Sequence, residues 1–231
     1  MKLVESALNL LLPPHCVVCA RQGAWFCEAC IQQIQPLPEP KCSHCGRPLL
    51  QPGLCRRCRI ERSYLLSIDS CSAHRQPLRK VIHEFKYGGM AVLSEPLAGL
   101  MALTWASRHL QCDRIIPVPL HPARVRERGY NQSTLLARAL SRHLHIIVDE
   151  KTLVRVRNTP AQVGLSRQER RQNMDGAFCC SSVLEGSAVL LVDDVCTTGA
   201  TLEACARVLL DAGAASVRAL TVARALARIS P

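Results

Sequence analysis

The chain has 231 residues, of which 48% are hydrophobic and 3% aromatic, and its formal net charge is +11. This length suffices for one ordinary α/β domain with a small appendage, and no apolar run is long enough to span a bilayer. The charge favours anionic partners such as phosphates, pyrophosphate or nucleic acid, whereas so few aromatic rings argue against binding single strands chiefly by stacking.

The first twelve residues combine one lysine with a short apolar patch that Glu5 and Asn9 interrupt. The segment lacks a small-residue cleavage site, so a short amphipathic helix is expected rather than a signal peptide. We therefore expect a cytoplasmic protein that does not insert into membranes.

Eight of the fourteen cysteines form four pairs, each with two residues between its members. They are Cys16, Cys19, Cys27, Cys30, Cys42, Cys45, Cys55 and Cys58. Two thiolates at this spacing in a tight turn can face one ion, and two such turns make a closed tetrahedral zinc site. The pattern predicts two structural Zn²⁺ ions in an N-terminal domain, residues 1–62. With both ions bound, the net charge becomes about +7.

Unmetallated thiols are the alternative to these zinc sites. We expect the first two pairs to share one ion and the last two the other, although an interleaved pairing stays open. His15 and His44 stand beside ligand cysteines, and they are expected to be bystanders because the thiolates already fill both sites. The other six cysteines are scattered, mostly among apolar neighbours, as reduced core thiols are.

From residue 63 the composition changes to long apolar-periodic stretches, which indicates a second domain over residues 63–231. Helices are predicted over residues 78–86, 93–108, 132–143 and 201–211, the last closed by Gly213. Strands are predicted over residues 114–119, 145–148, 188–192 and 216–222. The polar, basic stretch 155–173 is predicted to be a mobile loop. Strands that alternate with helices indicate a parallel sheet.

The most informative stretch is residues 189–201. An apolar strand delivers Asp193 and Asp194 at its carboxyl end, and a loop of small and hydroxyl-bearing residues follows. The loop consists of Thr197, Thr198, Gly199, Ala200 and Thr201. Small residues let backbone N–H groups approach an anion, and the start of a helix adds a favourable dipole. The two acids are acceptors beside this phosphate site, where sugar hydroxyls would lie.

This stretch resembles, nearly position for position, the signature with which type I phosphoribosyltransferases bind phosphoribosyl pyrophosphate (PRPP). The resemblance implies that residues 197–201 cradle the 5′-phosphate and that PRPP binds with Mg²⁺. It also implies that Asp193 and Asp194 form the catalytic pair, which takes the ribose hydroxyls. Enzymes for 6-oxopurines usually carry an acid where this chain has Thr197, so this position looks more like that of the orotate enzymes.

A second group of residues must hold the pyrophosphate, for which backbone amides and arginine forks are suited. The candidates are Val118, Pro119, Leu120, Arg124 and Arg128, with Lys86 and Arg167 as further cations on apparent loops. For any one arginine, the alternative is a solvated surface charge.

Further motifs extend the resemblance over nearly the whole chain. They lie at residues 85–88, 118–120, 128–132, 162–167, 173 and 176–178, between the cysteine pairs and the PRPP signature. On these motifs the chain is identified as a member of the ComF family, which includes the GntX-type proteins. This resemblance implies an α/β fold with the twisted parallel sheet and flanking helices of a type I phosphoribosyltransferase, preceded by a small double zinc ribbon.

The family is associated with natural competence, the uptake of transforming single-stranded DNA, and with the use of DNA as a nutrient. The resemblance therefore implies a PRPP-binding phosphoribosyltransferase-like protein with single-stranded DNA and a DNA-uptake ATPase, or another competence protein, as further partners. Two alternatives are a non-catalytic module that binds PRPP or DNA, and an adaptor that docks on the ATPase through its zinc ribbons.

Overall fold

The computed structural model describes residues 13–159 and 167–226. A five-stranded parallel sheet in the order β1-β7-β6-β2-β3 forms its centre. The strands are β1 (Ser67–Ala73), β2 (Arg114–Pro117), β3 (Ile147–Val148), β6 (Ala188–Cys196) and β7 (Ser216–Arg224). A separate antiparallel pair joins β4 (Leu153–Arg155) to β5 (Phe178–Cys180).

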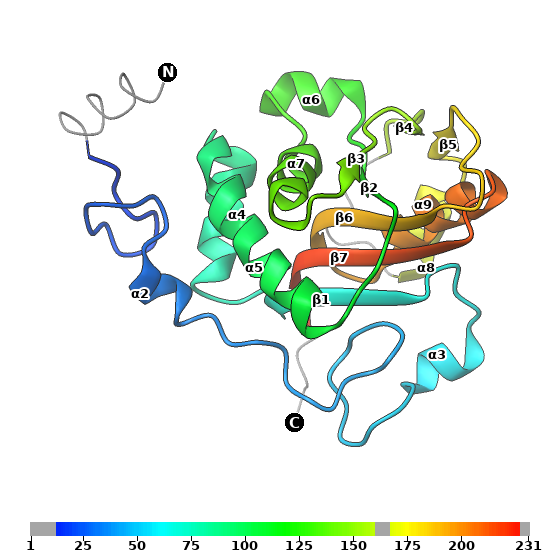
Figure 1. The fold of residues 1–231 in the computed structure, drawn as a ribbon, viewed down its shortest axis with the longest axis horizontal. Coiled ribbons are helices and arrows are strands. Elements are labelled where there is room, and N and C mark those ends of the chain that lie inside the picture. Colours follow the sequence, from blue (N-terminus) through cyan, green and yellow to red (C-terminus); the bar gives the residue numbers. More distant parts are fainter. Residues whose placement is uncertain (1–12, 160–166, 227–231) are drawn as a thin grey trace.

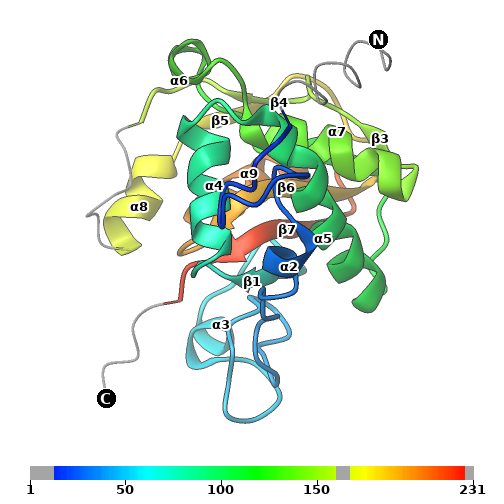
Figure 2. The ribbon, with the colours of Figure 1, turned by 90° about the vertical axis from the view of Figure 1, so that its left-hand side faces the viewer.

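Helices cover both faces of the sheet (Figures 1 and 2). One layer contains α4 (Leu78–Tyr87), α5 (Ser94–Ser107) and α7 (Gln132–Leu144), with the 3₁₀ turn η1 (Ala91–Leu93) between α4 and α5. The other contains α8 (Arg167–Met174) and α9 (Ala200–Asp211). Along β6, Leu190 and Val192 belong to the core under the first layer, whereas Val189 and Leu191 belong to the core under the second. Both faces are buried, which explains the continuous apolar run of this strand.

The two cysteine-rich modules lie at different places on this domain (Figures 1 and 2). The first, which includes α2 (Glu28–Ile31), lies against the layer of α4 and α5, and its Phe26 belongs to the same buried core as Leu78 and Val81. The second, which includes α3 (Arg56–Ile60), lies beside β1, at the edge of the sheet.

The predicted helices and strands of the second domain are present, with ends that shift by up to four residues. β6 extends to Cys196, so the two acids belong to the strand itself. The strand β1 was not predicted. Among the described residues, no helix is both long and apolar enough to cross a membrane.

The prediction of a loop over residues 155–173 was partly wrong, because β4 includes Arg155 and α8 begins at Arg167. α8 is almost wholly polar and is anchored by Met174, which is 1% exposed. A single apolar residue at its end produces no helical periodicity that the sequence could show. Residues 160–166 of this loop, which include motif residues 162–166, and the amphipathic helix expected within residues 1–12 lie outside the described residues.

Candidate functional site

The eight paired cysteines form two compact clusters. One contains Cys16, Cys19, Cys27 and Cys30, and the other contains Cys42, Cys45, Cys55 and Cys58, with the sulfur atoms of each cluster within 4.8 Å of one another. Cys19 Sγ lies 3.6 Å from Cys27 Sγ, and Cys45 Sγ lies 3.8 Å from Cys55 Sγ. Thiolates around a tetrahedral zinc with bonds of about 2.3 Å stand about 3.8 Å apart, so both clusters fit the ion. Each cluster therefore combines two cysteine pairs that follow each other along the chain.

One thiol in each cluster has a lowered pKa, which favours its ionised form. Burial alone would raise the pKa of Cys16, but donation from backbone N–H groups, including that of Cys27 at 3.5 Å, outweighs it and lowers the pKa to about 6. The corresponding bond from the Cys55 N–H to Cys42 Sγ is 3.4 Å long, and the pKa of Cys42 is likewise lowered to about 6. Ionised thiols are the form that binds zinc.

A cavity of about 680 Å³ opens at the carboxyl ends of the strands. Its lining includes Asp193, Asp194, Thr197 and Thr201, which come from β6, the turn after it and the start of α9. Ligands of open parallel sheets bind at this edge of the sheet.

The two acids have different surroundings. Asp193 Oδ1 accepts hydrogen bonds from Ser133 Oγ at 2.8 Å and from the Asp194 N–H at 2.9 Å. Burial and the neighbouring charge of Asp194 raise the pKa of Asp193 to about 7, against the opposing effect of Lys86. Asp194 is 3% exposed, and Lys86 Nζ lies 2.9 Å from its Oδ1. Its other oxygen, Oδ2, is buried and has no hydrogen-bond partner among the described residues.

Basic side chains line the same cavity. Arg124 and Arg128 reach it from α6 (Pro122–Arg128), and Arg155 reaches it from the end of β4. Arg155 donates to the Thr159 hydroxyl and lies over the Phe178 ring at 5.5 Å, but its buried Nε finds no partner within the described part of the chain. Burial, with the nearby charge of Arg124, lowers the pKa of Arg155. Two guanidinium groups are thus held close together where an anion would relieve their repulsion.

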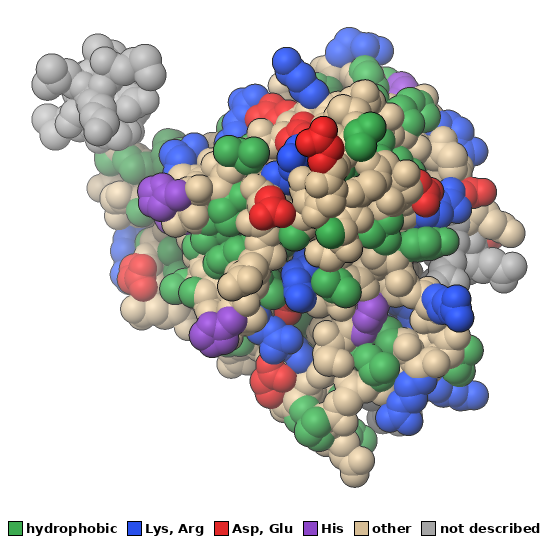
Figure 3. Space-filling model, turned by 45° about the vertical axis from the view of Figure 1, so that its right-hand side comes forward, with side chains coloured by type: hydrophobic (Ala, Val, Ile, Leu, Met, Phe, Trp, Pro, Cys, Tyr) green, Lys and Arg blue, Asp and Glu red, His purple; other side chains and the backbone are tan. Residues whose placement is uncertain are grey.

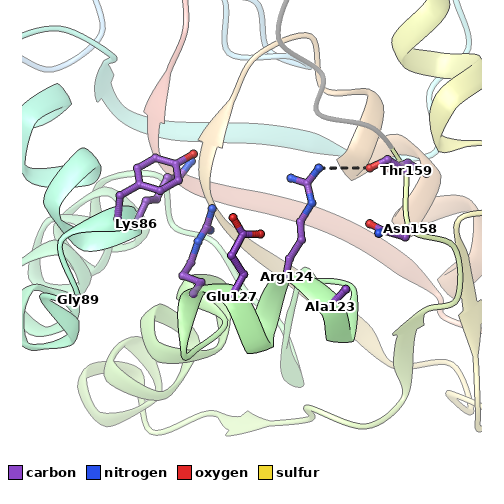
Figure 4. A pocket seen from close by; sticks show the side chains of 9 residues that line it. Lys86, Gly89, Ala123, Arg124, Glu127, Asn158 and Thr159 are labelled. Carbon is purple, nitrogen blue, oxygen red and sulfur yellow. Dashed lines mark hydrogen bonds between the residues drawn. The ribbon is translucent and has the colours of Figure 1, made fainter.

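A second cavity, of about 900 Å³, adjoins the first and shares Lys86, Tyr87, Arg124 and Arg128 with it. Figure 4 shows Arg124 and Glu127 projecting from α6 between Lys86 on one side and Asn158 and Thr159 on the other. Arg124 donates to the Thr159 carbonyl at 3.3 Å. The Arg128 guanidinium lies 5.0 Å from the centre of the Tyr87 ring and donates to Gln132 Oε1 at 2.6 Å. Hydrogen bonds and a contact with an aromatic ring therefore hold Arg124 and Arg128 in position.

Comparison with known proteins gives two domain matches and several relatives. Residues 7–59 match the double zinc ribbon domain family, and residues 131–231 match the phosphoribosyl transferase domain family. The chain is 34% identical over 227 residues to DNA utilization protein YhgH of Salmonella typhimurium, which covers 94% of this chain and 100% of the relative. It is 35% identical over 209 residues to competence protein F of Haemophilus influenzae, which covers 87% and 90%. The chain belongs to the ComF/GntX family.

Among solved structures, this ComF/GntX protein is similar to the glutamine PRPP amidotransferase of B. subtilis, with a TM-score of 0.42 and 19% identity. That match covers 60% of this chain and 30% of the amidotransferase chain. The parallel sheet with flanking helices is the fold expected from the sequence, and the N-terminal part is the expected double zinc ribbon with two clusters of four cysteines.

The structure brings most of the predicted site residues of this family member together. The acids, Thr197 and Thr201 line the 680 Å³ cavity, as do all the described pyrophosphate candidates, namely Lys86, Val118, Pro119, Leu120, Arg124 and Arg128. Thr198 and Gly199 form the turn before α9, which begins at Ala200, and the Ala200 N–H lies 3.4 Å from Thr198 Oγ1; these three residues are not part of the cavity lining. The side chain of Arg167 lies outside the described residues.

Sequence reasoning missed several residues that line the cavity. They are His74, Arg79, His83, Ser133 and Arg155. The first three follow β1, whose alternation of serine with other residues gave no strand signal, so the end of this strand was not expected at the site. Burial and the charges of Lys86 and Arg79 lower the pKa of His74. Arg155 was part of the stretch interpreted as a loop, and only its place at the end of β4 directs it inward.

Proposed function

We propose that this protein binds Mg²⁺·PRPP in the 680 Å³ cavity and acts there as a phosphoribosyltransferase. One observation carries the proposal: Asp194 Oδ2, a buried acceptor, and Arg155 Nε, a buried donor, both lack partners among the described residues and belong to side chains that line the same cavity. A buried polar atom without a partner is costly, so a ligand that supplies both partners is favoured. A ribose that carries phosphates has hydroxyl groups for the acid and phosphate oxygens for the guanidinium.

The 5′-phosphate would bind at residues 197–201. Gly199 has a φ of +84°, and α9 begins at the next residue. The backbone N–H groups in the first turn of this twelve-residue helix would point at the anion, and the hydroxyls of Thr197 and Thr201 would add donors. The ribose would then lie over Asp193 and Asp194, which accept from its 2′- and 3′-hydroxyls.

The pyrophosphate would lie toward α6. Lys86, Arg124 and Arg128 would be its cations, and residues 118–120, where Leu120 can donate a backbone N–H, line the same part of the cavity. Arg167 would be a further cation. The site fits Mg²⁺ because carboxylate oxygens, hydroxyls and phosphates are the ligands this ion prefers. When bound, Mg²⁺ would neutralise charge on the pyrophosphate and improve it as a leaving group.

In the reaction, the bond from ribose C1 to the pyrophosphate oxygen breaks, and its electron pair leaves with the pyrophosphate. C1 gains positive character, which the carboxylates of Asp193 and Asp194 stabilise, and a new bond forms between C1 and the acceptor. Arginines held in place before the reaction stabilise the departing charge without reorganising.

Calorimetry with Mg²⁺·PRPP tests this proposal. The double variant Asp193→Asn, Asp194→Asn should lose binding and turnover, while Asp211→Asn, an exposed acid at the end of α9, should bind as the wild type does. Wild-type binding that is unchanged in the double variant would contradict the placement of ribose. Absence of wild-type binding would reject PRPP as the ligand.

The cellular process is proposed from the relatives, which are named for DNA utilization and for competence. We infer that this cytoplasmic protein works in DNA uptake or in the use of DNA as a nutrient, with single-stranded DNA and a DNA-uptake ATPase or other competence protein as partners. On the face in Figure 3, Lys and Arg side chains are interspersed with acidic ones. If DNA is held by its phosphates, its affinity should fall steeply as salt is added, and near-constant affinity would reject a DNA-binding accessory role.

A further inference from the structure

The second zinc ribbon touches the loop that would hold the 5′-phosphate. Arg57, which lies between the ligands Cys55 and Cys58, donates from a terminal guanidinium nitrogen to the Thr198 carbonyl at 2.9 Å. Its Nε donates to Glu61 Oε2 at 3.1 Å, and its side chain is 15% exposed. The guanidinium is therefore fixed at both ends in a half-buried position, although 141 residues separate Arg57 from Thr198.

The other cysteine pair of this ribbon, Cys42 and Cys45, is connected to the same loop indirectly, by contacts with β1. The His44 carbonyl accepts from the Ile68 N–H at 2.7 Å, and a Cβ on Gly46 would stand 2.4 Å from the Ile68 carbonyl oxygen. The turn that carries Cys42 and Cys45 thus lies directly on the backbone of β1. Ile68 Cδ1 in turn would be 3.2 Å from a Cβ on Gly199, so its side chain covers the loop at the glycine with positive φ.

The segment that follows the second ribbon is also hydrogen-bonded to α9. Glu203, in the first turn of α9, accepts from Ser63 Oγ at 2.6 Å and from the Tyr64 N–H at 3.0 Å. The first ribbon, by contrast, contacts α4 and β1: Lys80 Nζ donates to the Val18 carbonyl at 3.3 Å, and Ser72 Oγ donates to the Gln35 carbonyl at 2.6 Å. The first ribbon thus has no such contact with α9 among the hydrogen bonds of the described residues.

We propose that the second zinc cluster is a structural part of the phosphate loop, with Arg57 as a positioning residue for residues 197–201. Zinc bound by Cys42, Cys45, Cys55 and Cys58 holds the loop in the conformation that receives a phosphate. Zinc bound by the first cluster stabilises the helical layer instead. The part of this proposal that concerns ligand affinity rests on the proposed PRPP function, whereas the part that concerns loop order does not.

The test compares Arg57→Gln with Arg56→Gln, an exposed arginine in the same short helix. Zinc content is measured first, and both variants should retain two ions per chain. Amide hydrogen exchange of residues 197–201 is then measured without ligand. Exchange should accelerate about tenfold in Arg57→Gln, which loses one hydrogen bond to a charged group, and stay unchanged in Arg56→Gln. Arg57→Lys, which keeps one donor, should restore part of the protection.

A second pair of variants tests the zinc ion itself. Cys58→Ser and Cys19→Ser each remove one ligand from a different cluster, so zinc content should fall to one ion per chain in both. Only Cys58→Ser should accelerate exchange in residues 197–201. Equal exchange in this loop for Cys58→Ser, Arg57→Gln and the wild type would overturn the proposal.

Calorimetry with Mg²⁺·PRPP separates the two proposals. If the proposed function holds, Arg57→Gln should weaken binding about tenfold, in line with the lost hydrogen bond. If wild-type protein does not bind PRPP but Arg57→Gln still loosens the loop, the coupling stands and only the ligand assignment fails. Weakened PRPP binding with unchanged loop exchange would reject Arg57 as a positioning residue.

Discussion

Lys86 Nζ lies 2.9 Å from Asp194 Oδ1, so a lysine of α4 already pairs with one of the two acids where the ribose is proposed to bind. Burial alone would lower the pKa of Lys86, but the charge of Asp194 outweighs it and raises the pKa. The lysine therefore stays charged, and its positive charge reduces the repulsion between the adjacent carboxylates of Asp193 and Asp194.

Replacing Lys86 by methionine should raise the pKa of Asp193 further above its value of about 7, because the cation that opposes the charge of Asp194 is gone. A ¹³C NMR titration of the aspartate carboxyls would measure this shift. Lys151→Met, at an exposed site, is the control. An unchanged titration of Asp193 would show that Lys86 does not govern the acid pair.

Binding of Mg²⁺·PRPP should depend on pH through Asp193. The pKa of this acid is raised to about 7, so below pH 7 the free protein holds a proton there that the ligand must displace. Affinity should then rise about tenfold per pH unit up to about pH 7 and level off above it, as one displaced proton requires. Calorimetry in buffers of different ionisation enthalpy would count that proton. The reference is Asp193→Asn, in which the ligand still titrates but residue 193 does not. The same proton count in this variant and in the wild type would refute the linkage between Asp193 and binding.

The same pKa shift has a consequence for stability. The pKa of Asp193 in the folded protein lies above its unfolded value near 4, so the unfolded state binds fewer protons between those values. The contribution of Asp193 to the free energy of unfolding is fully present below about pH 4 and is lost as the pH rises toward about 7. Asp193→Asn should therefore gain stability relative to the wild type between pH 4 and pH 7.5, which urea unfolding at several pH values would measure. A constant difference would contradict the raised pKa.

Arg155→Met should weaken PRPP binding about tenfold to a hundredfold, because its Nε, which has no partner in the described part of the chain, could no longer bind a phosphate oxygen. Its stability should stay within about 1 kcal/mol of the wild type, since a half-buried guanidinium beside Arg124 is itself unfavourable. Calorimetry and thermal unfolding give the two values, and Arg142→Met, at an exposed ion pair, is the control. Full affinity in Arg155→Met would remove Arg155 from the site.

Phe26→Ala should destabilise the whole domain by about 3 kcal/mol, because Phe26 is 4% exposed and belongs to the same core as Leu78 and Val81. Scanning calorimetry should show one transition that moves to lower temperature. Trp25→Ala, at a 37% exposed neighbour, should shift it much less. A separate early transition in Phe26→Ala would show that the first ribbon unfolds independently.

Much of the site could be predicted because its chemistry is local. The cysteine pairs show their chelating geometry within four residues, and the acids and the phosphate loop follow one another in a single stretch. The longer apolar-periodic helices were predicted for the same reason. Elements without a clear pattern were not: β1 and α8 contain few apolar residues in a regular pattern, and β4 is only three residues long. The places of His74, after β1, and of Arg155, at the end of β4, therefore could not be foreseen.

The sequence by itself determined the two kinds of ligand chemistry in this protein, four thiolates for each metal ion and an acid pair followed by a phosphate-binding turn. Short covalent spacing keeps the two cysteines of each pair close together, and likewise the acids and the turn that follows them, whatever the fold. Only the tertiary structure decided which distant groups meet them. Lys86 reaches Asp194 because α4 packs over the carboxyl end of the sheet, and Arg57 reaches the Thr198 carbonyl because the second ribbon lies on the edge strand β1. Such contacts depend on the packing of whole elements, which no local pattern encodes.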